Sequence, residues 1–303
     1  MIYHSFNQLL DKVRDNPVKR KVAVAGAADR HVLEALLQAQ KAGISDPVLI
    51  GNGSEIARNL EALGCLWENY DIVDASDPVQ CGETAAELIR EHKADFIMKG
   101  MIETRDVLKP LVKKENGLSL GRTMSHVALN EIPGMNRLTA LTDGGMVPHP
   151  TLEEKRDIIL NAAEMFLALG YEEPSVAVLC AVEKVNPKMP ETIDAEALVR
   201  MSREGTISGC RVAGPISYDI AMSAVIAKEK GYPCADCGSF DILAVPSMVA
   251  GNLLNKSLTV TAGARMAGVI MGARVPVVVT SRSSSAGEKF LSLALASLMD
   301  IIV

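Results

Sequence analysis

VPVVVTSRSSSAGEKFLSLALASLM, residues 275–299, is the stretch from which the fold of this chain is predicted most directly. Four valines surround one proline at its start, which is typical of a short strand buried on both faces of a parallel sheet. Small polar residues follow from Ser281 to Gly287, and apolar residues then recur at helical spacing from Phe290 to Leu298. The stretch therefore predicts a strand, a turn and a helix.

The turn at residues 281–287 is also expected to receive an anion. In open α/β sheets such turns lie at the carboxyl ends of strands, where backbone N–H groups at a helix N-terminus can bind negative charge. Arg282 adds a planar fork of hydrogen-bond donors at the same place. A surface arginine lying over the sheet edge is the alternative, but the position directly after a buried strand favours a binding role. An anionic substrate, such as a phosphorylated compound, is predicted.

Strands alternate with helices in the first part of the chain. Asp29 and Asp77 stand where they can cap helices, and Gly43 and Gly64 stand where helices should end. The apolar runs predict strands at 21–27, 48–50, 70–73 and 96–98 and helices at about 29–43, 54–63, 78–92 and 104–114. This alternation predicts a parallel sheet that is covered on both faces.

A proline-rich segment separates this first series from a second one. Pro133 and Gly134 predict a turn between strands at 124–129 and 138–142, and Thr151 with Glu154 forms a capping-box pattern soon afterwards. Further strands are expected at 176–181, 211–213 and 242–245, with helices at 192–203, 217–230 and 249–258. The predicted fold class is therefore α/β, with two doubly wound domains.

The composition excludes several functional classes. The 303 residues are 48% hydrophobic and 22% charged, as in an ordinary globular protein, and the net charge is −6. A nucleic-acid or anionic-membrane surface would need a basic excess, so neither partner is expected. We find no signal-peptide pattern and no membrane-spanning run, and we expect a cytoplasmic protein.

The six cysteines are expected to be free thiols, because a chain of this length does not need disulfides for stability. Cys234 and Cys237 form one C-x-x-C pair, which could be a redox motif or half of a zinc site. No second C-x-x-C pair or histidine-rich segment accompanies it in the sequence. Neither a metal nor another cofactor is therefore predicted.

Several strand-end motifs occur together in a characteristic order. They are Met98-Lys99-Gly100, Ser125-His126-Val127-Ala128, Thr142-Asp143, residues 181–189 (AVEKVNPKM), Gly214-Pro215, Asp219, Ala250-Gly251-Asn252, Lys256-Ser257-Leu258 and Thr280-Ser281-Arg282. With these motifs the chain resembles the phosphate acetyl/butyryltransferases, and the butyryltransferase branch most closely. The resemblance extends almost from end to end.

The resemblance implies a fold like that of isocitrate and isopropylmalate dehydrogenases, with an active site in a cleft between two domains. We expect the first domain to comprise residues 1–136 and 275–303 and the second to comprise residues 137–274. The implied reaction interconverts a short-chain acyl-CoA plus phosphate and an acyl phosphate plus CoA. Acyl-CoA, CoA, phosphate and acyl phosphate are then the small-molecule partners, and a homodimer or higher homo-oligomer is the implied assembly.

The resemblance assigns three catalytic residues. Ser281 and Arg282 match the pair that contacts the acyl phosphate, and Glu288 matches the carboxylate that deprotonates the CoA thiol. The chemistry suits these residue types, because a thiol must lose its proton before it attacks, and the carbonyl oxygen gains charge as it does so. Glu288 has a structural alternative, because Ser285-Ala-Gly-Glu288 is itself a capping-box pattern.

Further residues are expected to bind substrate at neighbouring strand ends. They are Lys99, Thr142, Asp143, Gly214, Pro215, Gly251 and Asn252. Asp143 could instead make an Asx turn, Gly251 and Asn252 could be simple turn residues, and Lys99 could merely solubilise its loop. His126 is expected to be a core residue rather than a catalyst.

Three positions depart from the pattern of the butyryltransferase branch. Ser284 and Ala213 stand where the relatives commonly carry aspartate, and Val147 replaces an asparagine at the end of the Thr-Asp motif. These changes leave the acyl specificity open. A phosphate acetyltransferase, a nicotinamide-dependent dehydrogenase of the same fold class and a CoA-binding protein without turnover are the alternatives, although residues 26–28 (GAA) are only a weak echo of a dinucleotide-binding fingerprint.

Overall fold

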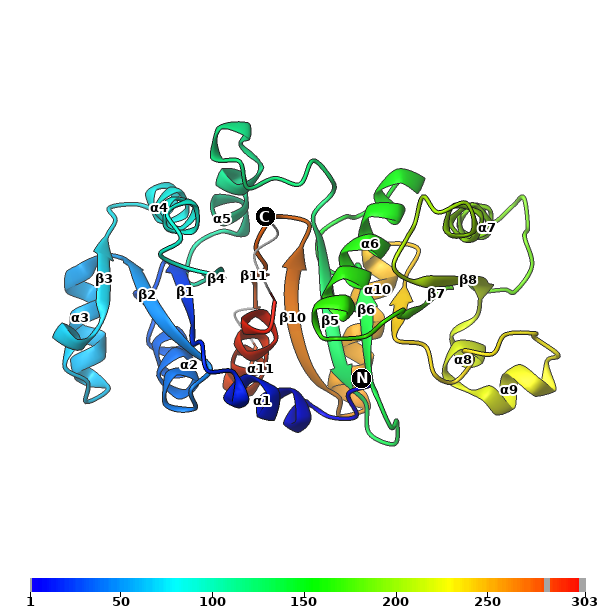
Figure 1. Ribbon diagram of the computed structural model, residues 1–303, viewed down its shortest axis with the longest axis horizontal. Helices are drawn as coiled ribbons and strands as arrows, with labels where there is room; N and C mark the ends of the chain where they lie inside the picture. The colour runs from blue at the N-terminus through cyan, green and yellow to red at the C-terminus, as the bar shows by residue number, and fades with distance from the viewer. Residues whose placement is uncertain (1, 281–283, 300–303) are drawn as a thin grey trace. The chain divides into compact units, whose positions relative to one another are not determined.

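The computed structural model describes residues 2–280 and 284–299 of the chain. These residues form two compact units (Figure 1). Unit 1 consists of Met1–Phe6 and Arg122–Met266, and unit 2 consists of Asn7–Gly121 and Ala267–Val303. The chain therefore passes between the units at 6/7, 121/122 and 266/267, whereas the sequence pattern placed the domain boundaries at 136/137 and 274/275. The boundary lies at 121/122 and not at 136/137 because the strand Ser125–Glu131 pairs along its length with Leu138–Thr142 and so belongs to unit 1.

The strands of unit 2 lie in the order β3-β2-β1-β4-β11-β10. β3, β2, β1, β4 and β11 are parallel, whereas β10 runs antiparallel to β11. The bounds of these strands are β1 Arg20–Ala25, β2 Ser45–Gly51, β3 Asp71–Asp74, β4 Phe96–Lys99, β10 Arg265–Met271 and β11 Val277–Val278. β11, from the stretch that opened the sequence analysis, is thus an interior strand although it is read late in the chain.

The helices of unit 2 flank its sheet. Their bounds are α1 Phe6–Asp15, α2 Arg30–Lys41, α3 Gly53–Ala62, α4 Pro78–Arg90, α5 Thr104–Val112 and α11 Ala286–Ser297. Asp29 and Asp77 cap α2 and α4 as predicted, each by accepting a backbone N–H through its carboxylate. α2 packs beside α11, and α4 packs beside α5 on the opposite side of the strands (Figure 1).

The strands of unit 1 lie in the order β5-β6-β9-β7-β8. β5 is antiparallel to β6, with the predicted turn at Pro133-Gly134 between them, and the other pairs are parallel. The bounds are β5 Ser125–Glu131, β6 Leu138–Thr142, β7 Ser175–Leu179, β8 Arg211–Ile216 and β9 Ile242–Ala244. The carboxyl ends of β6, β9, β7 and β8 therefore meet at one edge of this sheet, together with the start of β5.

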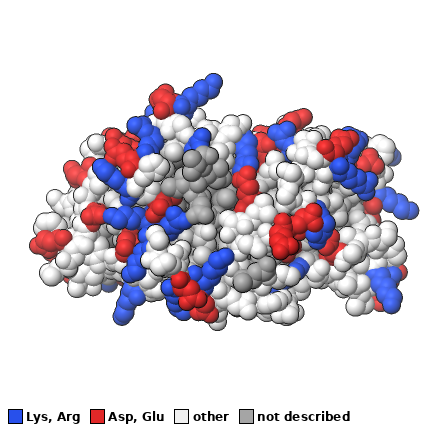
Figure 2. Space-filling model, viewed as in Figure 1, with Lys and Arg blue, Asp and Glu red and all other residues white. Residues whose placement is uncertain are grey.

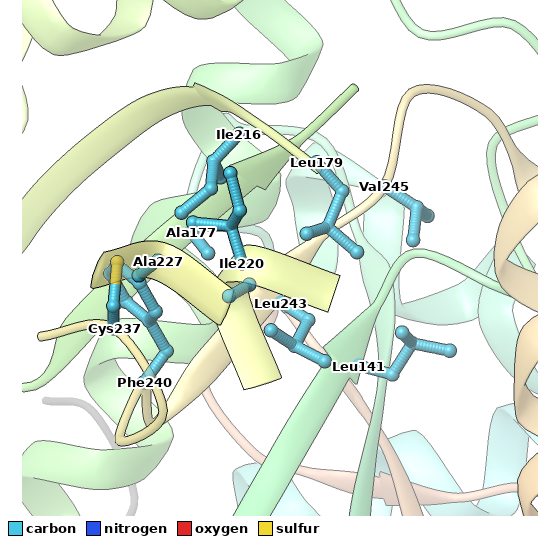
Figure 3. Close-up of a cluster of buried hydrophobic side chains, with 11 residues drawn as sticks. Leu141, Ala177, Leu179, Ile216, Ile220, Ala227, Cys237, Phe240, Leu243 and Val245 are labelled. Carbon is cyan, nitrogen blue, oxygen red and sulfur yellow. The ribbon is translucent and has the colours of Figure 1, made fainter. Parts of the chain in front are cut away.

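The helices of unit 1 are α6 Leu152–Ala168, α7 Pro190–Arg203, α8 Tyr218–Met222, α9 Ala224–Glu229 and α10 Met248–Lys256, which continues as a π-helical turn at Ser257–Thr261. A buried apolar cluster holds α8 and α9 against β6, β7 and β9 (Figure 3). Its largest members include Phe240, Ile216 and Leu243. Burial of such side chains contributes about 1.5–3 kcal/mol each to folding, so this cluster anchors the outer strands of unit 1.

Two elements differ from those that the sequence predicted. The expected helix at 217–230 is broken at Ser223, whose backbone is extended and whose hydroxyl accepts the N–H of Ile226 to start α9. The strand β10 was not predicted, because its glycine and its short apolar run show neither the alternation of a strand nor the spacing of a helix.

The charged side chains at the surface are of both signs, as the composition of the chain suggests. On the face in Figure 2, Lys and Arg side chains lie among Asp and Glu. All six cysteines are free, as expected, and burial raises the pKa of both the Cys180 and Cys210 thiols to about 11. In the described part of the chain, no helix is long and apolar enough to cross a membrane.

Candidate functional site

Ser281 and Arg282 lie outside the described residues, and β11 precedes them in the chain. Val277 and Val278 of β11 pair in parallel with Ile97 and Met98 of β4. Because the two strands run side by side in the same direction, Thr280 and Lys99 leave the sheet at the same edge. The Lys99 ammonium donates to the carbonyl oxygens of Gly100 at 3.2 Å and Ile102 at 3.0 Å.

Glu288 lies in the first turn of α11 and is half-buried. Ser285 caps this helix, because its hydroxyl accepts the backbone N–H of Glu288 at 3.1 Å. The Glu288 carboxylate accepts a hydrogen bond from the hydroxyl of Ser284 at 2.5 Å. The Ser285 half of the capping-box pattern is therefore present, and the carboxylate contacts the side chain of the residue before the cap.

Lys289, the neighbour of Glu288, is buried to 7% exposure. Its ammonium donates to the carbonyl oxygen of Ser284 at 2.6 Å. Ser284 is thus held twice, at its carbonyl by Lys289 and at its hydroxyl by Glu288. These contacts tie the first turn of α11 to Ser284, which is two residues after Arg282 in the sequence.

Asp143 organises the loop that follows β6. Its buried carboxylate accepts three backbone N–H groups, from Gly145 at 2.7 Å, Met146 at 3.0 Å and Val147 at 2.9 Å. Thr142 is fully buried, and its hydroxyl donates to the carbonyl oxygen of His126 across the sheet. Both side chains therefore fix the backbone of the loop, and the Asx-turn alternative describes the contacts of Asp143 in this structure.

Gly251 and Asn252 lie against the same loop. A Cβ atom on Gly251 would lie 2.8 Å from the Asp143 carbonyl oxygen, so only glycine allows this approach. The Asn252 side-chain amide donates to the carbonyl oxygen of Gly144 at 3.2 Å. Four predicted site residues, Thr142, Asp143, Gly251 and Asn252, are thus brought together at one strand end.

His126 lies at the start of β5 beside this loop. A Cβ atom on Gly145 would lie 3.3 Å from Cγ of the His126 ring, so glycine is what lets the loop lie against the ring. Burial lowers the pKa of His126, and the nearby Asp143 carboxylate opposes that shift. The imidazole is therefore favoured in its neutral form. The sequence predicted a core histidine here, and the structure places His126 half-buried at the edge of the sheet where β6 ends.

Gly214 and Pro215 occupy the outer strand β8, away from the Asp143 loop. A Cβ atom on Gly214 would lie 2.9 Å from the Val178 side chain, and the Pro215 carbonyl oxygen accepts the Tyr232 hydroxyl at 3.1 Å. Gly214 thus allows β8 to lie close to β7, and Pro215 contacts the segment that follows α9. In the order of the sheet, β9 and β7 separate them from Thr142.

A charged group follows β7 and β8, and it joins Glu183 of the motif at residues 181–189 to Asp219, which the sequence analysis also named. The Ser217 hydroxyl lies 2.5 Å from the Glu183 carboxylate and 2.6 Å from that of Asp219. Lys230 donates to Asp219 at 2.8 Å and lowers the pKa of that carboxyl to about 2. The Ser217 hydroxyl likewise lowers the pKa of Glu183. The group ties together the loops that leave these two strands.

Comparison with known proteins identifies the chain. The family model described as phosphate acetyl/butaryl transferase matches residues 79–297. The chain is 42% identical over 295 residues to the phosphate butyryltransferase of Clostridium acetobutylicum, which covers 97% of this chain and 98% of that protein. It is also 42% identical over 278 residues to the phosphate acetyltransferase of Thermotoga maritima, covering 92% of this chain and 94% of that protein.

Solved structures agree with this relationship. A branched-chain phosphotransacylase from Enterococcus faecalis V583 matches with a TM-score of 0.81 and 33% identity over 93% of this chain and 99% of that chain. A 4-hydroxythreonine-4-phosphate dehydrogenase from Burkholderia phymatum shares the fold alone, with a TM-score of 0.57 and 14% identity over 94% of this chain and 99% of that one.

Fold and strand-end site together define a mixed α/β protein of the phosphotransacylase type. The chain belongs to the phosphate acetyl/butyryltransferase family of acyltransferases. For the dehydrogenase alternative, the similarity to 4-hydroxythreonine-4-phosphate dehydrogenase is one of fold alone. In the part of the chain that the structure describes, no three His, Cys, Asp or Glu side chains gather as a metal site.

Proposed function

We propose that the chain transfers a short acyl group reversibly between CoA and inorganic phosphate. The observation that carries the proposal is the 42% identity to a phosphate butyryltransferase over 97% of the chain. The half-buried Glu288 carboxylate at the N-terminus of α11 supports it further, because the Ser284 hydroxyl orients this group.

In the proposed mechanism, Glu288 accepts the proton of the CoA thiol while the sulfur attacks the carbonyl carbon of the acyl phosphate. The new C–S bond forms, the carbonyl oxygen takes up negative charge, and the C–O bond to phosphate then breaks. Arg282 and Ser281 would donate hydrogen bonds to the developing oxyanion and the departing phosphate. The reverse direction uses the same residues. Ser281 and Arg282 then donate hydrogen bonds to the carbonyl oxygen of the thioester while phosphate attacks its carbonyl carbon.

The substrate-binding roles of Lys99, Thr142, Asp143, Gly214, Pro215, Gly251 and Asn252 are also proposals. The contacts described above support a division of labour. Lys99 brings a cation to the end of β4 beside β11, whereas Asp143 and Gly251 shape the backbone of a loop.

We further propose that the finer fold relationship is to isocitrate and isopropylmalate dehydrogenases, that the chain acts as a cytoplasmic homodimer, and that CoA and phosphate are its substrates without a bound metal. The scheme itself uses only proton transfer, hydrogen bonds and fixed charge. Light scattering at several protein concentrations tests the dimer, and a monomeric mass would contradict it.

The acyltransferase activity is tested by mixing the purified protein with butyryl-CoA and phosphate and by following CoA release with a thiol reagent. Release that depends on phosphate and needs no nicotinamide supports the proposal. A matched reaction without acyl-CoA measures the contribution of the protein's own partly exposed thiols, Cys65 and Cys234. Thermal stabilisation by CoA without turnover would instead indicate a binding protein.

Acyl specificity is the point on which the relatives divide, because the butyryl and acetyl enzymes are equally similar to this chain. We expect C4 or branched C4–C5 chains to exceed acetyl-CoA in kcat/KM. Each buried methylene can contribute about 0.8 kcal/mol, which is about fourfold in rate. A panel of acetyl-, propionyl-, butyryl-, isobutyryl- and valeryl-CoA measures this order, and a clear preference for acetyl-CoA would make the phosphate acetyltransferase alternative the better one.

A further inference from the structure

Lys289 carries a positive charge in an environment that does not favour one. Its side chain is buried to 7% exposure in the first turn of α11. The N-terminus of a helix already bears a partial positive charge, so a cation is electrostatically unfavourable there. Among the described residues, no carboxylate forms an ion pair with Lys289, and its hydrogen-bond acceptor is the carbonyl oxygen of Ser284.

Burying a charged side chain costs free energy unless the charge is paired and hydrogen-bonded. A neutral side-chain donor would be enough to hold one loop carbonyl oxygen by a hydrogen bond. The charged donor makes a stronger and shorter hydrogen bond, here 2.6 Å. Its acceptor belongs to Ser284, whose hydroxyl donates in turn to the Glu288 carboxylate at 2.5 Å. The three residues form one continuous chain of contacts from the buried ammonium to the proposed base.

The side chains of neighbouring residues point in different directions along this helix. Glu288 is partly exposed, whereas the side chain of Lys289 is buried. The buried Lys289 contacts the carbonyl oxygen of Ser284, and the partly exposed Glu288 contacts its hydroxyl. Ser284 is held between them, so movement of its backbone would also move the hydroxyl that orients Glu288.

We propose that Lys289 is a positioning residue for acyl transfer. It fixes the Ser284 carbonyl, and Ser284 thereby holds the Glu288 carboxylate in the orientation needed to accept the thiol proton. This inference rests on the proposed function, and it assigns roles to Lys289 and Ser284 that concern the rate of the chemical step rather than the binding of substrate.

The test begins with Lys289→Met, which keeps the apolar length of the side chain and removes its charge. We expect kcat to fall about 10- to 100-fold, the scale for a misplaced catalytic group, while KM for butyryl-CoA and for phosphate changes less than about twofold. Lys41→Met is the matched control, because Lys41 is exposed at the end of α2, and it should retain full activity. Circular dichroism and melting temperature verify that each variant is folded.

Ser284 gives a second, independent variant at a half-buried position, which keeps the test usable if Lys289→Met folds poorly. Ser284→Ala removes the hydroxyl that contacts Glu288 and should lower kcat on the same scale. Ser284→Thr retains a hydroxyl and should recover most of the lost rate. Equal rates for the alanine and threonine variants would overturn the inference.

A double-mutant cycle with Glu288→Gln separates positioning from a merely structural role. If Lys289 and Ser284 act through the Glu288 carboxylate, adding either variant to Glu288→Gln should slow the enzyme less than about twofold further. Fully multiplicative effects would overturn the inference. So would a raised KM for phosphate with unchanged kcat in Lys289→Met, because this would make Lys289 a phosphate ligand.

Failure of the inference and failure of the proposed function give different results. Wild-type protein without phosphate-dependent CoA release would contradict the proposed function itself. Active wild-type protein with a slow Glu288→Gln variant but a fast Lys289→Met variant would contradict only the positioning role.

Discussion

Arg282 is the residue on which the proposed chemistry depends most strongly. Arg282→Ala should lower turnover by about 10²–10³, the usual scale for removing one charge-stabilising donor from a preorganised site, and should leave the fold intact. Lysine should restore little activity, because a point charge cannot reproduce the planar fork of two donors. Steady-state kinetics on folded variants measure both effects. Near-normal rates in Arg282→Ala would mean that the site lies elsewhere.

Glu288 is tested by Glu288→Gln. Glutamine can still accept the Ser284 hydroxyl, so the hydrogen bond seen in the structure is retained and the melting temperature should move only slightly. The amide cannot take up the thiol proton, and kcat should therefore fall by about 10²–10⁴ while CoA binding persists. Calorimetric titration with CoA and initial-rate kinetics measure the two quantities. A variant that keeps more than about a third of the wild-type rate, far above the usual loss of a general base, would remove Glu288 from the mechanism.

At the scale of elements, the contact between the Asp143 loop and α10 leaves almost no space. Gly251→Ala would place a Cβ atom 2.8 Å from the Asp143 carbonyl oxygen and 2.8 Å from the Gly144 Cα, and neither backbone atom can move without moving its loop. We expect destabilisation of about 1–3 kcal/mol, the usual cost of overpacking, together with a marked loss of activity. Denaturant unfolding measures the stability.

Val249→Ala is the control for this experiment, because Val249 lies in the same helix with 56% of its surface exposed. Its free energy of unfolding should remain within about 0.5 kcal/mol of wild type. If Gly251→Ala were equally harmless, the close contact between the loop and the helix would not contribute to stability.

Some elements were predictable because local signals agreed. Valines 275–279 predicted an interior strand, and Asp29 and Asp77 predicted helix starts that the structure has. Ser223 shows the limit, because a single hydroxyl that caps α9 splits a helix whose apolar spacing is otherwise continuous. Whether a serine caps or faces solvent depends on tertiary contacts.

The candidate site was predictable in its residue types more than in its contacts. Asp143 was expected at a strand end, but its three backbone partners within one loop and the approach of Gly251 depend on the folded chain. Lys289 was missed, because α11 is buried at every position from 291 to 297 and its helical period therefore does not mark which residue of the first turn is buried.

At the scale of the whole molecule, buried tyrosines should make stability fall at high pH. Burial raises the pKa of Tyr171 to about 12, from an ordinary value of 10.0, and its oxygen accepts the Tyr3 backbone N–H. Because the folded state holds this proton more tightly, the resulting stability is fully present below pH 10 and is lost as pH rises from 10 to about 12.

Tyr171→Phe tests this dependence. The variant should melt at a lower temperature than wild type at pH 8, because the buried Tyr3 N–H loses its acceptor. Its melting temperature should then fall less steeply between pH 10 and 12 than that of wild type. Parallel curves for the two proteins would show that ionisation of Tyr171 does not contribute.

The place of β11 has a consequence for biosynthesis. β11 lies between β4 and β10 in the sheet of unit 2, yet the ribosome synthesises it only after all of Arg122–Met266. During translation β4 can pair with β1 but has no partner at its other edge until β11 is synthesised. Its residues Phe96, Ile97 and Met98, which are buried in the folded protein, lie at this unpaired edge while the strands of unit 1 are already available to pair with one another. An open apolar strand edge is a site of aggregation. The nascent chain should therefore need chaperones most during the interval between the emergence of β4 and that of β11.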